Sequence, residues 1–559
     1  MVLMPLTLKI TTLSPVHIGS GDRLISGVDY LIHGDSLVVI SPDRLLRWIG
    51  ARPDQERLVS ILTTALANPK KGGIEEFLRQ INYQIDLATI AAYKIKSNGY
   101  RPLEVFSFIK TLTSHPILPG SSLKGAIRSA LLRGKVHEDT SLQRRIDSTL
   151  SREIEHFRSL IKNPEDRRKG PETKSEEIEG MVFVRDGINL NRLLQIRDSD
   201  PLDISRSLEL HKVQLLSIRE HHLGWKEKNS NYGNNPTTLY VEALRKNLTI
   251  ELAATWQTYL LSETASELRS NNIEALFAYW VDYLRIASLN LLVQEQAFYS
   301  RYGQTDLANW YEARINEIAN DSPAVILPLG WGGGYDAKTI TDLLSEQTFR
   351  LVVESFRNTQ GLGKPGRNPN AKWLGPLNSP KSRKVVVTQD NTLQPLGWVK
   401  VEIEYDAKAQ EWFEQQQKRF SDKKPSLPAL DDERVKYLPP LSGVESNIKK
   451  TTTSASIKPS HEQAPTPAPR PKTKEEKVIQ HFSETPKVGD IFLGTYLDTD
   501  NGEALFEIPG LDVDTQAYAV VAQKDLPSFW HKSKPLKLRV VKVIQERTSY
   551  FKVLCEVVI

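Results

Sequence analysis

The chain of 559 residues contains a single cysteine, Cys555. One thiol excludes an internal disulfide and a cysteine-rich zinc site. The sequence also lacks an uninterrupted apolar stretch close to the roughly 20 residues that span a bilayer, and its first residues lack the pattern of a signal peptide. These absences predict a soluble, cytoplasmic protein with no membrane partner.

A strong excess of one charge is also absent. The 73 lysines and arginines against 68 aspartates and glutamates give a net charge of only +5, so the total charge does not indicate a nucleic-acid partner. The places where basic residues gather are more informative than their number. The length and the 39% hydrophobic content suffice for more than one domain with a core of its own.

Self-contained catalytic motifs are missing as well. The chain has no Gly-x4-Gly-Lys-Ser/Thr loop for a nucleoside triphosphate, no HExxH or HxxEH cluster for zinc and no GxSxG serine elbow. Cys555 falls in a terminal strand pattern, where burial is expected. We therefore expect no catalytic residue, no metal and no cofactor.

What is present mixes strand and helix patterns. Alternating apolar residues predict strands over 6–19 and 27–40, around a loop from Ser14 to Ser26, and Ser41-Pro42-Asp43 predicts a helix start. Apolar residues at three- and four-residue spacing predict long helices over 237–261 and 271–299. Further strands are predicted over 105–112, 207–216, 324–330, 384–390 and 395–406. The combination predicts an α+β fold.

Composition divides the chain into five parts. A proline-, serine- and threonine-rich stretch predicts an extended, disordered linker, and the short alternating runs after it predict a small all-β barrel of SH3 or OB type. The predicted parts are a first piece of the main domain (1–132), a mainly helical insertion with some strands (133–320), a second piece of the main domain (321–421), the linker (422–474) and the barrel (475–559).

The first glycine-centred loop is ILPGSSLKGAIRSALL, residues 117–132. Backbone amides at a helix start beside cations make a seat for phosphate oxygens. Ser121 or Ser122 is expected to cap the helix, and Lys124 and Arg128 are four residues apart on one face. The alternative is a plain helix cap with both cations in solvent.

The second loop is LPLGWGGGYDAKT, residues 327–339, in which Gly332, Gly333 and Gly334 form a flexible arc. Consecutive glycines are costly in chain entropy, so we expect something to approach the backbone there. A flexible turn is the alternative. Without a P-loop, both seats suit a polyanion better than a nucleotide.

The segment 361–384 has many basic residues and no acidic one. Glycines and prolines predict an irregular, exposed loop, and cations around an aromatic ring are typical of single-strand recognition. The alternative is a solvated basic loop with its tryptophan packed against the domain. Its candidate RNA-binding residues are Lys364, Arg367, Lys372, Trp373, Lys381, Arg383 and Lys384.

The loop from Ser14 to Ser26 supplies three more candidates, His17, Gly19 and Arg23. His17 could stack on a base or donate to a phosphate, and a structural histidine is the alternative. Asp22 and Asp29 are the nearby carboxylates.

Five strings together resemble the RAMP superfamily of CRISPR proteins. Their order and content are most similar to the Csm5-type subunit of type III-A (Csm) effector complexes. The resemblance covers about Leu6–Asp406, and PGSSLKGAIR is its most specific part. The strings are LSPVHIGSG, LPGSSLKGAIRSAL, LQIRDSDPL, LGWGGGYDAKT and PLGWV.

The resemblance implies a ferredoxin-like, RRM-related core with a large insertion. It implies a subunit that binds the 3' region of the CRISPR guide RNA, caps the subunit filament and supports guide maturation in antiviral defence. Neighbouring RAMP backbone subunits, a small helical subunit and host nucleases are the implied partners. Residues implied to line the RNA path are His17, Ser121, Ser122, Lys124, Arg128 and the glycines at 332–334.

Related backbone subunits cut target RNA with an aspartate in a Gly-Gly-x-Asp-Asn-like context. The counterpart here is Asp29 in SGVDYLI, where Tyr30 replaces the asparagine. We therefore expect RNA binding without cutting. Two alternatives stay open: a metal-dependent endoribonuclease using Asp29 or Asp22 with His17, and a scaffold that recruits proteins.

Overall fold

The computed structural model divides the chain into two compact units, Met1–Asn229 with Asn234–Glu445, and Ser230–Gly233 with Ser446–Ile559. Each unit is described by itself. The described residues are 3–69, 72–160, 174–185, 188–219, 222–230, 233–258, 271–319, 323–359, 382–427, 478–479, 482, 486–500, 503–511, 517–522, 526, 536–547 and 550–557.

One sheet of the first unit is centred on its first strand, β1 (Leu3–Thr12). β1 pairs antiparallel with β15 (Thr249–Gln257) on one side and β19 (Trp398–Tyr405) on the other. β16 (Val325–Pro328) and β9 (Leu194–Ile196) continue the sheet beyond them. Alternate residues of β1 are buried, as its apolar pattern predicts. Strands from both ends of the unit thus share one sheet.

A second sheet lies in the same unit. Its strand order among the described residues is β2 (Gly19–Ile25), β6 (Glu104–Phe108), β14 (Thr238–Leu244), β10 (Leu208–Arg219), β5 (Ala91–Lys96), β4 (Ser36–Ile40) and β3 (Tyr30–His33). β10 also pairs with β17 (Ser382–Val387) and β11 (His222–Trp225), and β17 pairs with β18 (Leu393–Pro395). Shorter ribbons pair β7 (Val184–Arg185) with β8 (Ile188–Asn189), and β12 (Glu227–Ser230) with β13 (Gly233–Pro236).

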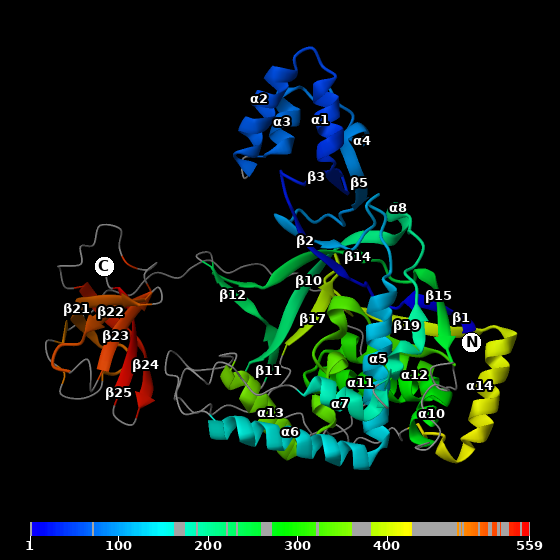
Figure 1. The fold of residues 1–559 in the computed structure, drawn as a ribbon. Helices are drawn as coiled ribbons and strands as arrows, with labels where there is room; N and C mark the ends of the chain where they lie inside the picture. Colours follow the sequence, from blue (N-terminus) through cyan, green and yellow to red (C-terminus); the bar gives the residue numbers. More distant parts are fainter. Residues whose placement is uncertain are drawn as a thin grey trace, which may run out of the picture. The chain divides into compact units, whose positions relative to one another are not determined.

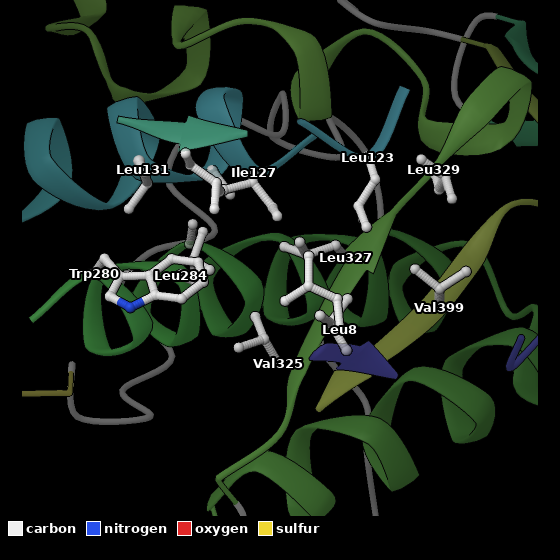
Figure 2. Packing of buried hydrophobic residues seen from close by; sticks show 14 of the residues in the cluster. Leu8, Leu123, Ile127, Leu131, Trp280, Leu284, Val325, Leu327, Leu329 and Val399 are labelled. Atoms are coloured by element: carbon white, nitrogen blue, oxygen red, sulfur yellow. The ribbon is translucent and has the colours of Figure 1, made fainter. Parts of the chain in front are cut away.

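Two long helices, α5 (Gly120–Glu138) and α11 (Trp280–Arg301), build the core with the β1 sheet. Figure 2 shows Leu123 and Ile127 of α5 and Leu284 of α11 pointing towards strand residues such as Leu8 and Val325. The helices cross closely at Gly134, where a Cβ would lie 2.9 Å from the Tyr283 carbonyl carbon. Burial of these apolar faces against the sheet is the main stabilising contribution.

One group of further helices lies beside β3 and β5, away from α5 and α11 (Figure 1). A helical group with its own hydrophobic cluster follows β4, and Ser41 caps its first helix by accepting from the Arg44 amide. The group comprises α1 (Pro42–Gly50), α2 (Gln55–Leu66), α3 (Ile74–Gln80) and α4 (Leu87–Ile90). The other helices are α6 (Thr140–Leu160), α7 (Ser175–Phe183), α8 (Ile204–Ser207), α10 (Asn271–Ala278), α12 (Thr305–Ala319), α13 (Glu346–Thr359) and α14 (Ala407–Arg419). Short 3₁₀ segments are η3 (Leu190–Arg192), η4 (Gly330–Gly333), η5 (Asp336–Lys338), η6 (Thr341–Leu343) and η7 (Ser421–Lys423).

The second unit contains a small β-barrel. Within its described residues the order β21-β22-β23-β25-β24 closes because β24 also pairs with β21, and β20 (Val478–Ile479) adds to one side. Phe492, Phe506 and Leu538 are fully buried inside it. The closing strands are β21 (Ile491–Asp500), β22 (Glu503–Glu507), β23 (Ala517–Ala522), β24 (Leu536–Arg547) and β25 (Tyr550–Val557).

The structure confirms the α+β class and the barrel, and it corrects several predicted elements. The predicted helix over 237–261 is wrong: the segment forms β14 and β15, and β15 buries every second residue. The predicted loop Ser14–Ser26 contains β2, and 27–40 forms a hairpin of β3 and β4. Most of the predicted linker 422–474 lies outside the described residues.

Candidate nucleic-acid interface

The first glycine loop turns into α5 at Gly120, and the predicted serine cap is wrong. Pro119 holds the N-cap position without a side-chain hydrogen bond. Instead, the Asp198 carboxylate accepts from the Gly120 amide at 2.8 Å. Glycine is needed because a Cβ there would lie 2.6 Å from the Arg197 carbonyl oxygen. The helix start is therefore fastened to segment 196–199, and one of its amides already has an anionic partner.

Beyond this start, α5 presents cations on one face. Lys124 and Arg128 lie one turn apart, as predicted, and Ser121 is exposed at the beginning of the helix. Partial burial lowers the pKa of Lys124, and the charges of Arg128 and Arg192 lower it further. Arg128 contacts Glu179 at 3.5 Å but keeps 47% of its side chain exposed. We call Lys124, Arg128 and Arg192 the α5 patch. The RNA-binding roles of Ser121, Ser122, Lys124 and Arg128 remain predictions.

The second glycine loop forms η4, and its glycines pack against the chain's own backbone. A Cβ at Gly332 would overlap the Leu396 carbonyl and lie 2.9 Å from the Gly397 amide. The Trp331 amide donates to the His17 carbonyl at 2.9 Å, and the Leu329 amide donates to the Gly397 carbonyl at 2.6 Å. The expected close approach is confirmed, and at Gly332 it comes from segment 396–397. Contact of Gly332 with RNA stays a prediction.

Gly333 and Gly334 are less enclosed. A Cβ at Gly333 would meet the Pro328 side chain at 3.3 Å, and Gly334, with φ 69°, has no described heavy atom within 4 Å of such a Cβ. Contact with a polyanion at these two positions stays a prediction.

His17 is buried, with 3% of its surface exposed. Its Nδ1 lies 2.7 Å from the Glu242 carbonyl oxygen, and its ring meets Trp331 edge-on at 5.4 Å. Burial lowers the pKa of His17, so the imidazole is neutral at physiological pH. A Cβ at Gly19 would lie 3.1 Å from the His17 Nε2. His17 is therefore a structural histidine, which was the alternative to a role in RNA binding. The buried ring does not support stacking of His17 on a base.

Trp331 was not among the residues predicted to bind RNA. It packs between His17 and Phe106, with ring centroids at 5.4 and 5.3 Å. The Lys384 ammonium sits 4.4 Å above its ring centre. Burial lowers the pKa of Lys384, and Lys338 adds to the effect. Lys384, the last residue of the basic segment 361–384, lies on β17, where a strand was predicted from residue 384 onwards.

Arg383 also lies on β17, and the prediction that it is exposed is wrong. Its side chain is 13% exposed and bonds the Glu295 carboxylate at 2.8 and 3.0 Å. Asp336 lies 3.6 Å from the same guanidinium. The strand starts earlier than expected because Ser382 and Arg383 pair with β10. The other predicted residues of this loop lie outside the described residues: Lys364, Arg367, Lys372, Trp373 and Lys381.

Buried charges fix the chain after the glycine loop. Arg133 of α5 is 1% exposed and pairs with Asp342, and it also donates to Asn290 at 2.6 Å. Burial raises the pKa of Asp336 to about 7, with Asp342 adding to the rise and Arg383 opposing it. These contacts hold residues 336–342 against α5 and α11. Nothing in the local sequence distinguishes buried Arg133 from the solvent-facing cations of α5.

A second buried network lies beneath His17. Glu242 of β14 is fully buried, accepts from the Tyr93 hydroxyl at 2.7 Å and the Phe108 amide at 2.8 Å, and pairs with Lys110. A buried ion pair persists only when its hydrogen bonds are satisfied. The sequence reasoning missed this network because 237–261 was expected to be a helix.

The remaining candidates lie on and after β2. Arg23 is exposed, pairs with Glu104 at 2.7 Å and covers the Phe106 ring at 4.8 Å. Asp29 accepts from the Ile25 amide at 2.7 Å and so closes its own turn.

Within the described ranges, no group of three histidine, cysteine or acidic side chains is arranged to hold a metal ion. None of the described helices has the length and apolarity needed to cross a membrane.

Comparison with known proteins assigns the family. The model of the RAMP superfamily matches residues 9–288. The "CRISPR system Cms protein Csm5" of Mycobacterium tuberculosis (strain H37Rv) is 24% identical over 232 residues, which cover 38% of this chain and 59% of that protein. The protein of the same description from Methanocaldococcus jannaschii is 32% identical over 98 residues, covering 17% of this chain and 23% of that protein. The chain thus spans about 59% of the length of the mycobacterial relative.

Two solved structures also align with part of this chain. A chain of the "Csm-crRNA-target RNA ternary complex in type III-A CRISPR-Cas system" is 20% identical, with a TM-score of 0.49, and the match covers 71% of this chain and 100% of that one. The "T.onnurineus Csm5" crystal structure is 18% identical, with a TM-score of 0.44, and the match covers 70% and 99%. The family match and the sequence relatives together confirm the resemblance to Csm5-type RAMP proteins that the sequence motifs predicted.

Proposed function

Because this chain belongs to the RAMP superfamily, we propose that it is a non-catalytic RNA-binding subunit of a type III CRISPR effector complex. The relatives it matches are described as CRISPR system proteins. The proposal includes binding of the 3' region of the guide RNA, capping of the subunit filament and support of guide maturation, in the cytoplasm. Neighbouring backbone subunits, a small helical subunit and host nucleases are the proposed partners.

A single observation carries the RNA-binding proposal: the α5 patch. Its three cations, Lys124, Arg128 and Arg192, are gathered from two separate segments of the chain. Phosphate contacts of this kind position a nucleic-acid strand without reading its sequence. This suits a protein that must hold guides of many sequences.

A ferredoxin-like, RRM-related core is part of the same proposal. The β1 sheet, with α5 and α11 packed on it, supports this assignment. The proposed absence of cleavage is supported by Asp29, whose carboxylate accepts from the Ile25 amide in its own turn. Tyr30, next to it, is fully buried, so the expected asparagine position is part of the core.

The test is the double variant Lys124→Gln/Arg128→Gln in the assembled complex. We expect weaker guide RNA binding and a salt dependence whose slope falls by about 1.4, because two phosphate contacts to a single strand are lost. The matched control is Lys408→Gln/Lys418→Gln, which removes two exposed charges from α14. Guide content and affinity equal to those of the wild type in the α5 variant would refute the proposal.

A further inference from the structure

A cavity of about 560 Å³ lies in the first unit, at one end of the second sheet. Its walls come from segments that are distant in the sequence, among them the β5–β6 connection, β10, the β14–β15 turn and the β17–β18 turn. Its volume is in the usual range for small-ligand sites. The cavity, which we call the Tyr100 pocket, is lined among others by Pro15, Tyr100, Glu209, His211, Arg245 and Lys246.

One residue that lines the Tyr100 pocket, His211, lies on the sheet face that the second glycine loop covers. His211 lies directly opposite Val241 in the β10–β14 ladder, and directly opposed side chains share a face. Val241 belongs to the cluster against which Trp331 packs. Pro15 lines the pocket, and its carbonyl accepts from the Gly397 amide beside the glycine loop. The pocket and the glycine loop are thus neighbouring parts of one surface.

An aromatic ring and two cations give the pocket its chemistry. The Tyr100 hydroxyl donates to the Val387 carbonyl at 2.9 Å, and the Tyr240 ring packs beside it at 5.6 Å, so the ring is held in place. Arg245 is 40% exposed, and Lys246, the next residue, is exposed. A fixed ring with cations at the rim matches the two ends of a nucleotide, a planar base and a phosphate.

The floor of the pocket holds a polar group without a partner. The Nε2 of His211 is buried and, among the described residues, has no hydrogen-bond partner. Glu209 is 3.9 Å away, too far for a hydrogen bond, and it is 4.0 Å from Arg245. Burial lowers the pKa of His211 to about 4, so the ring is neutral. A buried polar atom left unpaired costs stability, and such positions are more frequent where a ligand binds.

We propose that the Tyr100 pocket holds one nucleotide of a single-stranded RNA, with its base against Tyr100 and its phosphate at Arg245 and Lys246. The inference rests on the proposed RNA-binding function, and it adds a second contact point to the α5 patch. The strand must be single because the base is presented only when it is unstacked and unpaired. Glu209 at the wall can accept a hydrogen bond from an amino group of the base.

The experiment measures the affinity of the full chain for a short single-stranded RNA and for the same strand without bases. Tyr100→Leu is expected to lose about tenfold in affinity for the RNA and nothing for the abasic strand. Tyr100→Phe loses the bond to Val387 but keeps the ring and its packing against Tyr240, and it is expected to bind the RNA more tightly than Tyr100→Leu. Arg245→Gln/Lys246→Gln should weaken both strands, whereas Lys408→Gln/Lys418→Gln should weaken neither. Thermal unfolding of each variant shows whether it is folded.

A 4-thiouridine in the RNA provides an independent measurement. Illumination should crosslink it to the peptide that contains Tyr100 or to the turn that contains Arg245. In one outcome, Lys124→Gln/Arg128→Gln loses RNA, the pocket variants bind RNA normally, and no crosslink forms to the peptides of the pocket. The pocket proposal is then wrong, and the proposed function stands. If the wild-type chain binds no RNA, both fail. Loss of a co-purifying protein, with RNA affinity unchanged, would also overturn the pocket proposal.

Discussion

Replacing Gly332 by alanine tests whether the second glycine loop exists for packing or for ligand contact. The added Cβ would overlap the Leu396 carbonyl and lie 2.9 Å from the Gly397 amide nitrogen. Both obstacles are backbone atoms. They cannot move aside cheaply, because Gly397 is hydrogen-bonded on both sides, to Pro15 at 2.7 Å and to Leu329 at 2.6 Å.

The size of the effect follows from this rigidity. Overpacking a filled interior costs about 1–3 kcal/mol, and a clash with fixed backbone belongs at the upper end. We therefore expect Gly332→Ala to lower the free energy of unfolding by about 3 kcal/mol, roughly a hundredfold change in the ratio of folded to unfolded chain. Gly333→Ala is the matched control in the same loop, since its Cβ would overlap no atom: the nearest are the Pro328 Cβ at 3.3 Å and the Ala337 Cβ at 3.6 Å.

Urea unfolding followed by tryptophan fluorescence measures this difference, because Trp331 lies in the loop itself. The two variants should differ by at least about 2 kcal/mol in the absence of RNA. If Gly332→Ala unfolds like Gly333→Ala but loses RNA, the glycine serves a ligand and the packing argument is refuted.

Two further predictions concern the buried charges. Lys110→Met leaves Glu242 buried and unpaired, so urea unfolding should show a loss of about 3–5 kcal/mol, and the double variant Lys110→Met/Glu242→Gln should recover part of it; equal losses would contradict the pairing. The pKa of Asp336 is raised to about 7, so the folded state binds more protons than the unfolded state between pH 3.8 and 7. Asp336 therefore stabilises the fold at low pH and loses this contribution as the pH rises through 7. The stability difference between wild type and Asp336→Asn should change in this window, and a constant difference would exclude the raised pKa.

Short-range patterns in the sequence determined many of the helices and strands of this protein. Ser41 before Pro42 predicted the start of α1, the three- and four-residue apolar spacing predicted α11, and the alternation of β1 predicted a half-buried strand. Lys124 and Arg128 were predictable as neighbours because the helical repeat itself brings them together. The motif strings predicted the family for the same reason, since each is a short continuous segment.

Tertiary structure decided what depends on distant partners. Residues 237–261 satisfy a helical spacing, but pairing with β1, β6 and β10 makes strands of 238–244 and 249–257. Arg383 is basic in a basic run, yet Glu295, far from it in sequence, removes it from solvent. Gly332 meets segment 396–397, and the Tyr100 pocket draws its walls from residues between 15 and 394. Short-range periodicity can be recognised directly in the sequence. Burial, charge pairing and cavities arise only when remote segments pack together.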